Sequence, residues 1–89
     1  MITVKAVYMD RAYRLITTLL ANVVGRLRRA DIVVEHVSGR IDVIEIQSKS
    51  DKEEDLKARN LEVLAALPAE LRGEVTVEKI PGAPYRRRR

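Results

Sequence analysis

Apolar residues recur with a helical spacing between Asp10 and Ala30, at positions 12, 15, 16, 19, 20, 23, 24 and 27. Intervals of three and one place these side chains along one broad side of an α-helix. Asp10 is a residue type that caps helix N-termini, because its carboxylate accepts hydrogen bonds from the free amides of the first turn. The pattern therefore predicts a long first helix over residues 10–30.

The segments on either side of this helix have the patterns of β-strands. Residues 2–8 alternate apolar and polar side chains, which predicts a strand with one buried side. Residues 31–37 and 41–47 are rich in β-branched side chains and are joined by Ser38-Gly39-Arg40, so they predict an antiparallel hairpin. Apolar residues occur at both odd and even positions of this hairpin. We therefore expect another element to cover the second face of the sheet.

The second half of the chain predicts one more helix and one more strand. Residues 50–67 open with Ser50 and Glu53, the spacing of a capping box. Asn60 lies inside the apolar stripe of this helix, where we expect a neighbouring backbone group to satisfy it, with a partner contact as the alternative. The stripe consists of Leu56, Val63, Leu64 and Leu67. Residues 74–80 predict the last strand, with Val75 and Val77 pointing inward.

The predicted order is β-α-β-β-α-β, which indicates an α+β fold of the ferredoxin-like type. We expect a four-stranded antiparallel sheet with two helices on one face and with the first and third strands in the centre. Residues 1–80 form the predicted single domain. Residues 81–89 consist of a proline- and glycine-containing break and a basic end that we expect to be mobile.

The charge of the chain is concentrated at its C-terminus. Of 17 basic residues, four are Arg86, Arg87, Arg88 and Arg89, which leaves 13 against 13 acidic residues elsewhere. The chain has no cysteine, and this excludes disulfides and thiolate chemistry. Its start lacks the pattern of a secretion signal, and its most apolar run, residues 15–27, is too short and too polar to span a bilayer. We expect a cytoplasmic protein without a membrane segment.

Residues that could support catalysis or bind a metal are few and scattered. His36 is the only histidine, and its strand neighbour Glu35 points to the other face, so we interpret His36 as structural or surface-exposed. Asp42, Glu45 and Glu35 are predicted to be solvated strand charges and not a catalytic carboxylate pair. The four glycines are dispersed and form no phosphate loop. We therefore expect no catalytic residues, no metal and no cofactor, and a protein that is not an enzyme.

One side of the predicted first helix carries small side chains where charged pairs are usual. Thr17, Ala21 and Gly25 lie four residues apart and would let another element approach closely. We expect this ridge to contact a second copy in a homo-oligomer. The alternative is a surface without a partner.

Two stretches resemble known regulatory families. VVGRLRRADIVVEHV resembles the ACT domain, especially the small regulatory subunit of acetolactate synthase, and VSGRIDVIEIQSKSDKEED is similar to the effector domains related to Lrp/AsnC regulators. The resemblance covers residues 2–80 and implies a small module that dimerises and binds amino acids at subunit junctions. Met9-Asp10-Arg11 stands where the ACT domain has a glycine turn. Asp10, Arg11 and Arg14 are therefore only positional candidates for ligand binding.

These observations lead to two hypotheses of function. The first is a non-catalytic regulatory or assembly module that acts as a homo-oligomer, with a small ligand at a subunit interface or a larger catalytic or regulatory protein as further partners. The alternative is a nucleic-acid-associated accessory protein that uses the arginine tail. Base stacking on the sheet is disfavoured, because the chain has three tyrosines and no phenylalanine or tryptophan.

Overall fold

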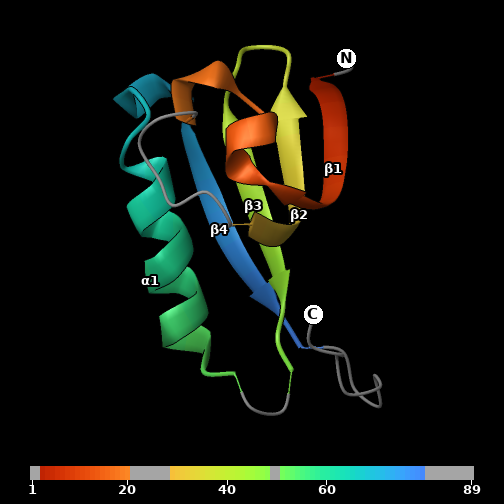
Figure 1. Cartoon of the computed structure of the whole chain (residues 1–89), viewed down its shortest axis with the longest axis vertical. Helices are drawn as coiled ribbons and strands as arrows, with labels where there is room; N and C mark the ends of the chain where they lie inside the picture. Colours follow the sequence, from red (N-terminus) through yellow and green to blue (C-terminus); the bar gives the residue numbers. More distant parts are fainter. Residues whose placement is uncertain (1–2, 21–28, 49–50, 80–89) are drawn as a thin grey trace.

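The computed structural model describes residues 3–20, 29–48 and 51–79 (Figure 1). Four β-strands, one α-helix and three short 3₁₀ turns make up this part of the chain. They are, in order, β1 (Val4–Ala12), η1 (Tyr13–Leu15), η2 (Thr18–Leu20), β2 (Arg29–His36), β3 (Ile41–Ile46), α1 (Glu53–Leu64), η3 (Ala69–Leu71) and β4 (Arg72–Glu78). The α+β class predicted from the sequence is confirmed.

The sheet is mixed, with the strand order β1-β2-β3-β4. β1 pairs with β2 and β2 with β3 in antiparallel fashion, whereas β3 and β4 are parallel. Helix α1 lies between β3 and β4 in the chain and provides the crossover that a parallel pair requires. The predicted all-antiparallel sheet and the central position of the first strand are therefore wrong: β1 is an edge strand, and β2 and β3 are central.

The long first helix is not found in the described part of residues 10–30. Residues 10–12 continue β1, and two 3₁₀ turns, η1 and η2, follow. Asp10 is not a helix cap, because its φ of 51° lies in the left-handed region, which aspartate tolerates better than most residues. Only part of the periodic apolar set is buried: Ile16 and Leu20 lie in the core, whereas Leu15 and Leu19 are exposed. The remainder of the predicted helix, residues 21–28, lies outside the described residues.

The predicted hairpin is confirmed. β2 and β3 are joined through Gly39, whose φ is 96° and whose amide donates to the carbonyl of His36 at 2.9 Å. The amide of His36 in turn donates to the carbonyl of Arg40 at 2.9 Å. Glycine is required here, because other residues adopt a positive φ only with strain.

The second predicted helix and the last predicted strand are present, with shifted ends. α1 begins at Glu53 after Lys52, which makes no side-chain cap, and Ser50 of the predicted capping box lies outside the described residues. Asp51 instead closes the loop before the helix, because its Oδ2 accepts hydrogen bonds from the amide and the hydroxyl of Ser48. β4 begins two residues earlier than predicted, at Arg72.

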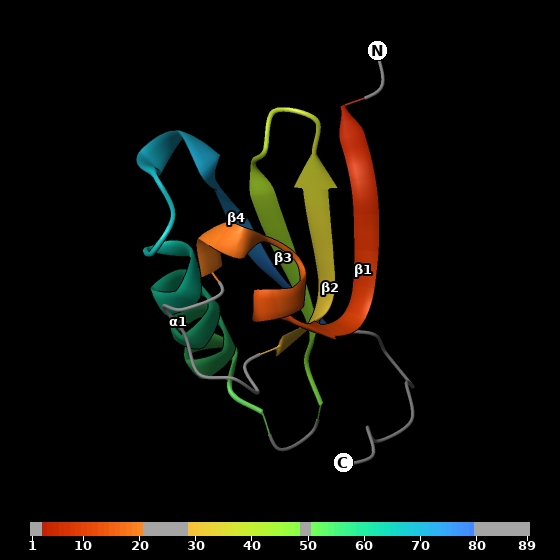
Figure 2. The same ribbon diagram turned by 45° about the horizontal axis from the view of Figure 1, so that its top comes forward.

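The hydrophobic core lies between one face of the sheet and the layer formed by α1 with η1 and η2 (Figure 2). Val33 and Val43 line the sheet side of this core, and Val63 and Leu64 line the helix side. The opposite face of the sheet carries a second apolar set that alternates with the first. We call it the open face; it consists of Val4, Val7, Met9, Ile32, Val34, Ile44 and Ile46.

Candidate functional site

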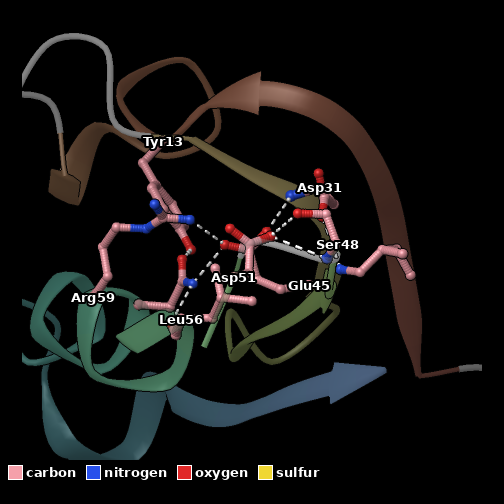
Figure 3. A network of polar contacts seen from close by, with 9 residues as sticks. Tyr13, Asp31, Glu45, Ser48, Asp51, Leu56 and Arg59 are labelled. Carbon is pink, nitrogen blue, oxygen red and sulfur yellow. Dashed lines mark hydrogen bonds and ion pairs between the residues drawn. The ribbon is translucent and has the colours of Figure 1, made fainter. Parts of the chain in front are cut away.

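A carboxylate lies buried between the sheet and helix α1. Glu45 is 1% exposed and sits on β3 on the same side as the core residues Ile41 and Val43 (Figure 3). Its Oε2 accepts hydrogen bonds from Arg59 Nη2 and Asn60 Nδ2, both at 2.8 Å, and its Oε1 accepts one from the amide of Asp31 at 3.0 Å. The prediction of a solvated charge at Glu45 is therefore wrong.

Helix α1 places Asn60 against this carboxylate because Asn60 lies on the buried side of the helix. Leu56, Asn60, Val63 and Leu64 repeat with intervals of four, three and one and are all buried. Asn60 Nδ2 also donates to the carbonyl of Leu56 at 2.8 Å, which confirms the predicted backbone partner. Asn60 Oδ1 accepts a hydrogen bond from the hydroxyl of Tyr13 at 2.5 Å. Asn60 thus joins the sheet, the helix and η1.

Asp31 extends the network along the sheet. Its Oδ2 accepts a hydrogen bond from the amide of Ile46 at 2.8 Å, while its own amide donates to Glu45. Asp31 and Glu45 therefore connect the start of β2 to the end of β3. These side-chain bonds lie next to the backbone pairs of the two strands, which run from Ile32 and Ile44 to Glu35 and Ile41. We refer to Tyr13, Asp31, Glu45, Arg59 and Asn60 as the carboxylate network (Figure 3).

The buried polar atoms of the carboxylate network are hydrogen-bonded within the protein. Among the described residues, no buried side-chain nitrogen or oxygen lacks a partner. A general base needs a lone pair directed at a substrate proton, and both oxygens of Glu45 already accept bonds from the protein. The arrangement therefore fits a role in positioning α1 and η1 on the sheet, since a satisfied polar network fixes one packing arrangement.

A second polar cluster lies at the hairpin end of the sheet. His36 Nε2 lies 2.5 Å from Asp42 Oδ2, Arg40 Nη2 lies 3.3 Å from the same oxygen, and the amide of Glu74 donates to Asp42 Oδ1 at 2.9 Å. Burial alone would raise the pKa of Asp42, but the hydrogen bonds from Glu74 and His36 and the charge of Arg40 outweigh it and hold this pKa below its usual range. We refer to His36, Arg40 and Asp42 as the hairpin cluster.

Glu35 is also engaged by neighbouring side chains. The hydroxyl of Tyr8 donates to Glu35 Oε1 at 2.9 Å, and Lys5 Nζ lies 3.8 Å from Glu35 Oε2. The hydrogen bond to Glu35 raises the pKa of Tyr8, with smaller contributions from desolvation and from the negative charge. These contacts attach the edge strand β1 to β2.

The positional ligand candidates lie at the end of β1 and in η1. Asp10 Oδ1 lies 3.7 Å from Arg29 Nη1, and the guanidinium of Arg11 lies 5.7 Å from the ring centre of Tyr8. Arg14 is an exposed residue of η1. The structure thus brings Asp10 together with a cation from β2, a partner that the sequence pattern did not indicate.

The predicted oligomer ridge is described only at its first residue. Thr17 lies between η1 and η2, and its Oγ1 accepts a hydrogen bond from the amide of Leu19 at 3.3 Å. Ala21, Gly25 and the arginine tail lie outside the described residues. The open face is an apolar surface of the described residues, and the apolar residues on both faces of the predicted hairpin indicated it.

Two features are absent from the described part of the chain, a metal-binding cluster and a membrane-spanning helix. No group of three or more histidine, aspartate or glutamate side chains in residues 3–20, 29–48 and 51–79 is arranged to hold a metal ion. In the same ranges, no helix has the length and apolar character needed to cross a membrane.

Comparison with known proteins gave no relative. No family model matches the chain, and no curated protein or solved structure is significantly similar to it.

Proposed function

We propose that this protein is a non-catalytic assembly or regulatory module that acts as a homo-oligomer. The observation that supports this proposal is the open face of the sheet. Val4, Val7 and Met9 of the edge strand β1 are 41%, 53% and 66% exposed. Contiguous apolar surface of this kind on a soluble domain is typical of a protein–protein contact.

The state of the polar clusters also favours assembly over catalysis. Glu45 and Asp42 direct both carboxylate oxygens at groups of the protein itself. Such residues stabilise the fold, and the function of the module then depends on its surface. Further partners would be a larger catalytic or regulatory protein that the assembled module binds.

Light scattering coupled to size-exclusion chromatography at micromolar concentration tests the proposal. We expect a particle whose mass is a multiple of the 10.1 kDa of one chain. Weak interfaces still associate at concentrations up to about 100 μM. A particle of 10.1 kDa at every concentration in this range would exclude the homo-oligomer.

The resemblance to ACT domains and Lrp/AsnC effector domains supports an amino acid as a small ligand at a subunit interface. Asp10, Arg11 and Arg14 are the candidate residues, since a cation binds a carboxylate and an anion binds an amino group. Titration calorimetry with the twenty amino acids tests this part. Binding that survives in Arg11→Gln and Arg14→Gln variants would place the ligand elsewhere.

The arginine tail supports a second candidate function, in nucleic-acid association. Residues 86–89 are all arginine, whereas the other basic and acidic residues balance at 13 each. Arginines near phosphates release counterions, so binding through the tail would weaken steeply as the salt concentration rises. A chain truncated after residue 85 should lose such binding to DNA or RNA. Absence of binding by the intact chain would exclude this function.

A further inference from the structure

We infer that a second copy of this chain packs on the open face, sheet against sheet, with the two-fold axis next to Ile32 and Val34 of β2. This inference rests on the proposed homo-oligomer and specifies its surface. It places the contact on the side of the sheet opposite the carboxylate network and helix α1.

The strand register places the apolar residues of the open face side by side. Met9 pairs with Ile32, and Ile32 pairs with Ile44, so three apolar side chains cross three strands in one row. Val7 and Val34 form the neighbouring row. The patch is therefore continuous over β1, β2 and β3.

Polar and charged groups border this patch on the fourth strand and at the hairpin end. On β4, Thr76 is the cross-strand partner of Ile44, and Glu78 is the partner of Ile46; both are exposed. At the hairpin end, Val34 is followed on β3 by Asp42 of the hairpin cluster. The centre of the patch lies on β2, and its border is polar. Protein interfaces have the same organisation, with an apolar centre and a polar rim.

The position of the charges favours a second copy centred on β2. A two-fold axis along β2 lays β1 of one chain over β3 of the other, where Asp42 keeps its bonds to His36, Arg40 and the amide of Glu74. It leaves β4 at the rim, where Glu78 stays in water. An axis between β2 and β3 would instead lay β1 over β4 and take Thr76 and Glu78 out of water, which costs desolvation energy. A basic partner could pair with Glu78 on β4, but it would leave the apolar centre of the patch without an apolar contact. The open face of a second copy provides that contact.

The size of the patch suits a reversible dimer. Three strands about 4.8 Å apart, followed over about six residues, cover roughly 300 Å² of sheet, and two such corrugated faces bury on the order of 1,000 Å² of accessible surface in total. That area is at the lower limit of specific interfaces. Two sheets that pack face to face lie about 10 Å apart with their side chains interdigitated. Such packing would give this 89-residue chain the second half of a sandwich core.

Single-cysteine variants test the position of the axis, because the chain contains no cysteine of its own. In Ile32→Cys and Val34→Cys, each thiol would face its own counterpart across the axis. We expect a short bis-maleimide to convert both variants to covalent dimers, about tenfold faster or more than the controls because of the high effective concentration. The controls are Thr76→Cys, on the same face but at the rim, and Leu61→Cys, which is exposed on α1.

A charged substitution on the open face tests the same surface without chemical cross-linking. Met9→Asp should weaken dimerisation about tenfold or more, because the carboxylate would be desolvated in the contact. The single chain should stay folded by circular dichroism, since Met9 is 66% exposed there. Leu19→Asp, at a residue that is 48% exposed and outside the open face, is the matched control.

The outcomes separate this inference from the proposed function. A wild-type chain that is always monomeric would overturn both. A dimer that cross-links through Leu61→Cys, or that Met9→Asp leaves unchanged, would overturn the inference while the homo-oligomer stands. The third outcome is a monomer in which truncation after residue 79 makes the thiol of Ile32→Cys more reactive. This result would show that the chain's own C-terminal segment occupies the open face, and it would also overturn the inference.

Discussion

The hydroxyl of Tyr13 donates a hydrogen bond of 2.5 Å to Oδ1 of Asn60, 47 residues further along the chain. Both residues are 1% exposed. The bond joins η1 directly to α1, and through Asn60 it reaches the carboxylate of Glu45 on the sheet. Three elements that are distant in sequence are therefore held by one chain of polar contacts.

Replacement of Tyr13 by phenylalanine tests the contribution of this bond. The variant keeps the ring in the core but leaves Asn60 Oδ1 buried without a donor, so we expect the free energy of unfolding to fall by about 1–2 kcal/mol. Urea titration monitored by circular dichroism measures the change. Tyr8→Phe is the control: it also removes a tyrosine hydrogen bond, but Tyr8 is partly exposed and water can solvate Glu35. An equal loss in the two variants would contradict the role of burial.

Replacement of Glu45 by glutamine should be more damaging than replacement of its cationic partner. The amide group of glutamine turns one acceptor into a donor that faces Arg59, Asn60 or the amide of Asp31, and we expect a loss of about 2–3 kcal/mol. Arg59→Gln should cost less, because the Arg59 side chain is 47% exposed and its removal leaves Glu45 with two donors. Urea titrations of both variants give the comparison. A larger loss for Arg59→Gln would indicate that the ion pair, and not the buried hydrogen bonds, dominates.

Gly73 is required by the close approach of β4 to β3. A Cβ atom at this position would overlap the backbone carbonyl of Ile41 and the carboxylate of Asp42. We expect Gly73→Ala to lower the free energy of unfolding by about 1–3 kcal/mol, as overpacking does elsewhere. Thr76→Ala, at an exposed position of the same strand, should cost less than about 1 kcal/mol. Thermal unfolding of both variants checks the difference, and equal melting temperatures would refute the close approach.

The parts of the fold that could be predicted are those that local chemistry determines. The hairpin depends on Gly39 and on two flanking β-branched segments, and α1 depends on the spacing of Leu56, Val63 and Leu64. Such signals lie within a few residues of each other. The strand order, in contrast, depends on which distant edges meet, and a β-α-β-β-α-β pattern does not determine it.

The prediction of a first helix is wrong over residues 10–20 for a physical reason. The apolar spacing around Ile16 and Leu20 suits a helix, but Ile16 reaches the core from the turn between η1 and η2, and Leu20 reaches it from η2. Leu15 and Leu19, which a broad helical side would also bury, remain exposed. The periodicity of apolar residues shows which side chains would lie on one side of a helix if a helix formed. Tertiary packing decides whether the helix forms and which of these side chains are buried.

Glu45 was missed because charged strand residues are usually solvated. The signal that could have indicated its burial is its parity, since Glu45 follows Ile41 and Val43 at intervals of two and so shares their face. Asn60 in the stripe of α1 supplied the complementary signal. A buried acid and a buried amide on two predicted neighbouring elements together favour a hydrogen bond between them.

Acid should destabilise the protein partly through Asp42. Because the folded-state pKa of Asp42 is lowered, its ionised form stabilises the fold at pH values above about 4, the usual pKa of aspartate, and this contribution is lost as the pH falls through the folded-state pKa. Asp42→Asn lacks this titration, so its stability should fall less than that of the wild type between about pH 5 and pH 2. Urea midpoints over this range measure the slopes. Glu70→Gln, at an exposed residue of η3, should keep the wild-type slope. If Asp42→Asn and the wild type lose stability in parallel, the contacts with His36, Arg40 and the amide of Glu74 do not hold the carboxylate in its charged form.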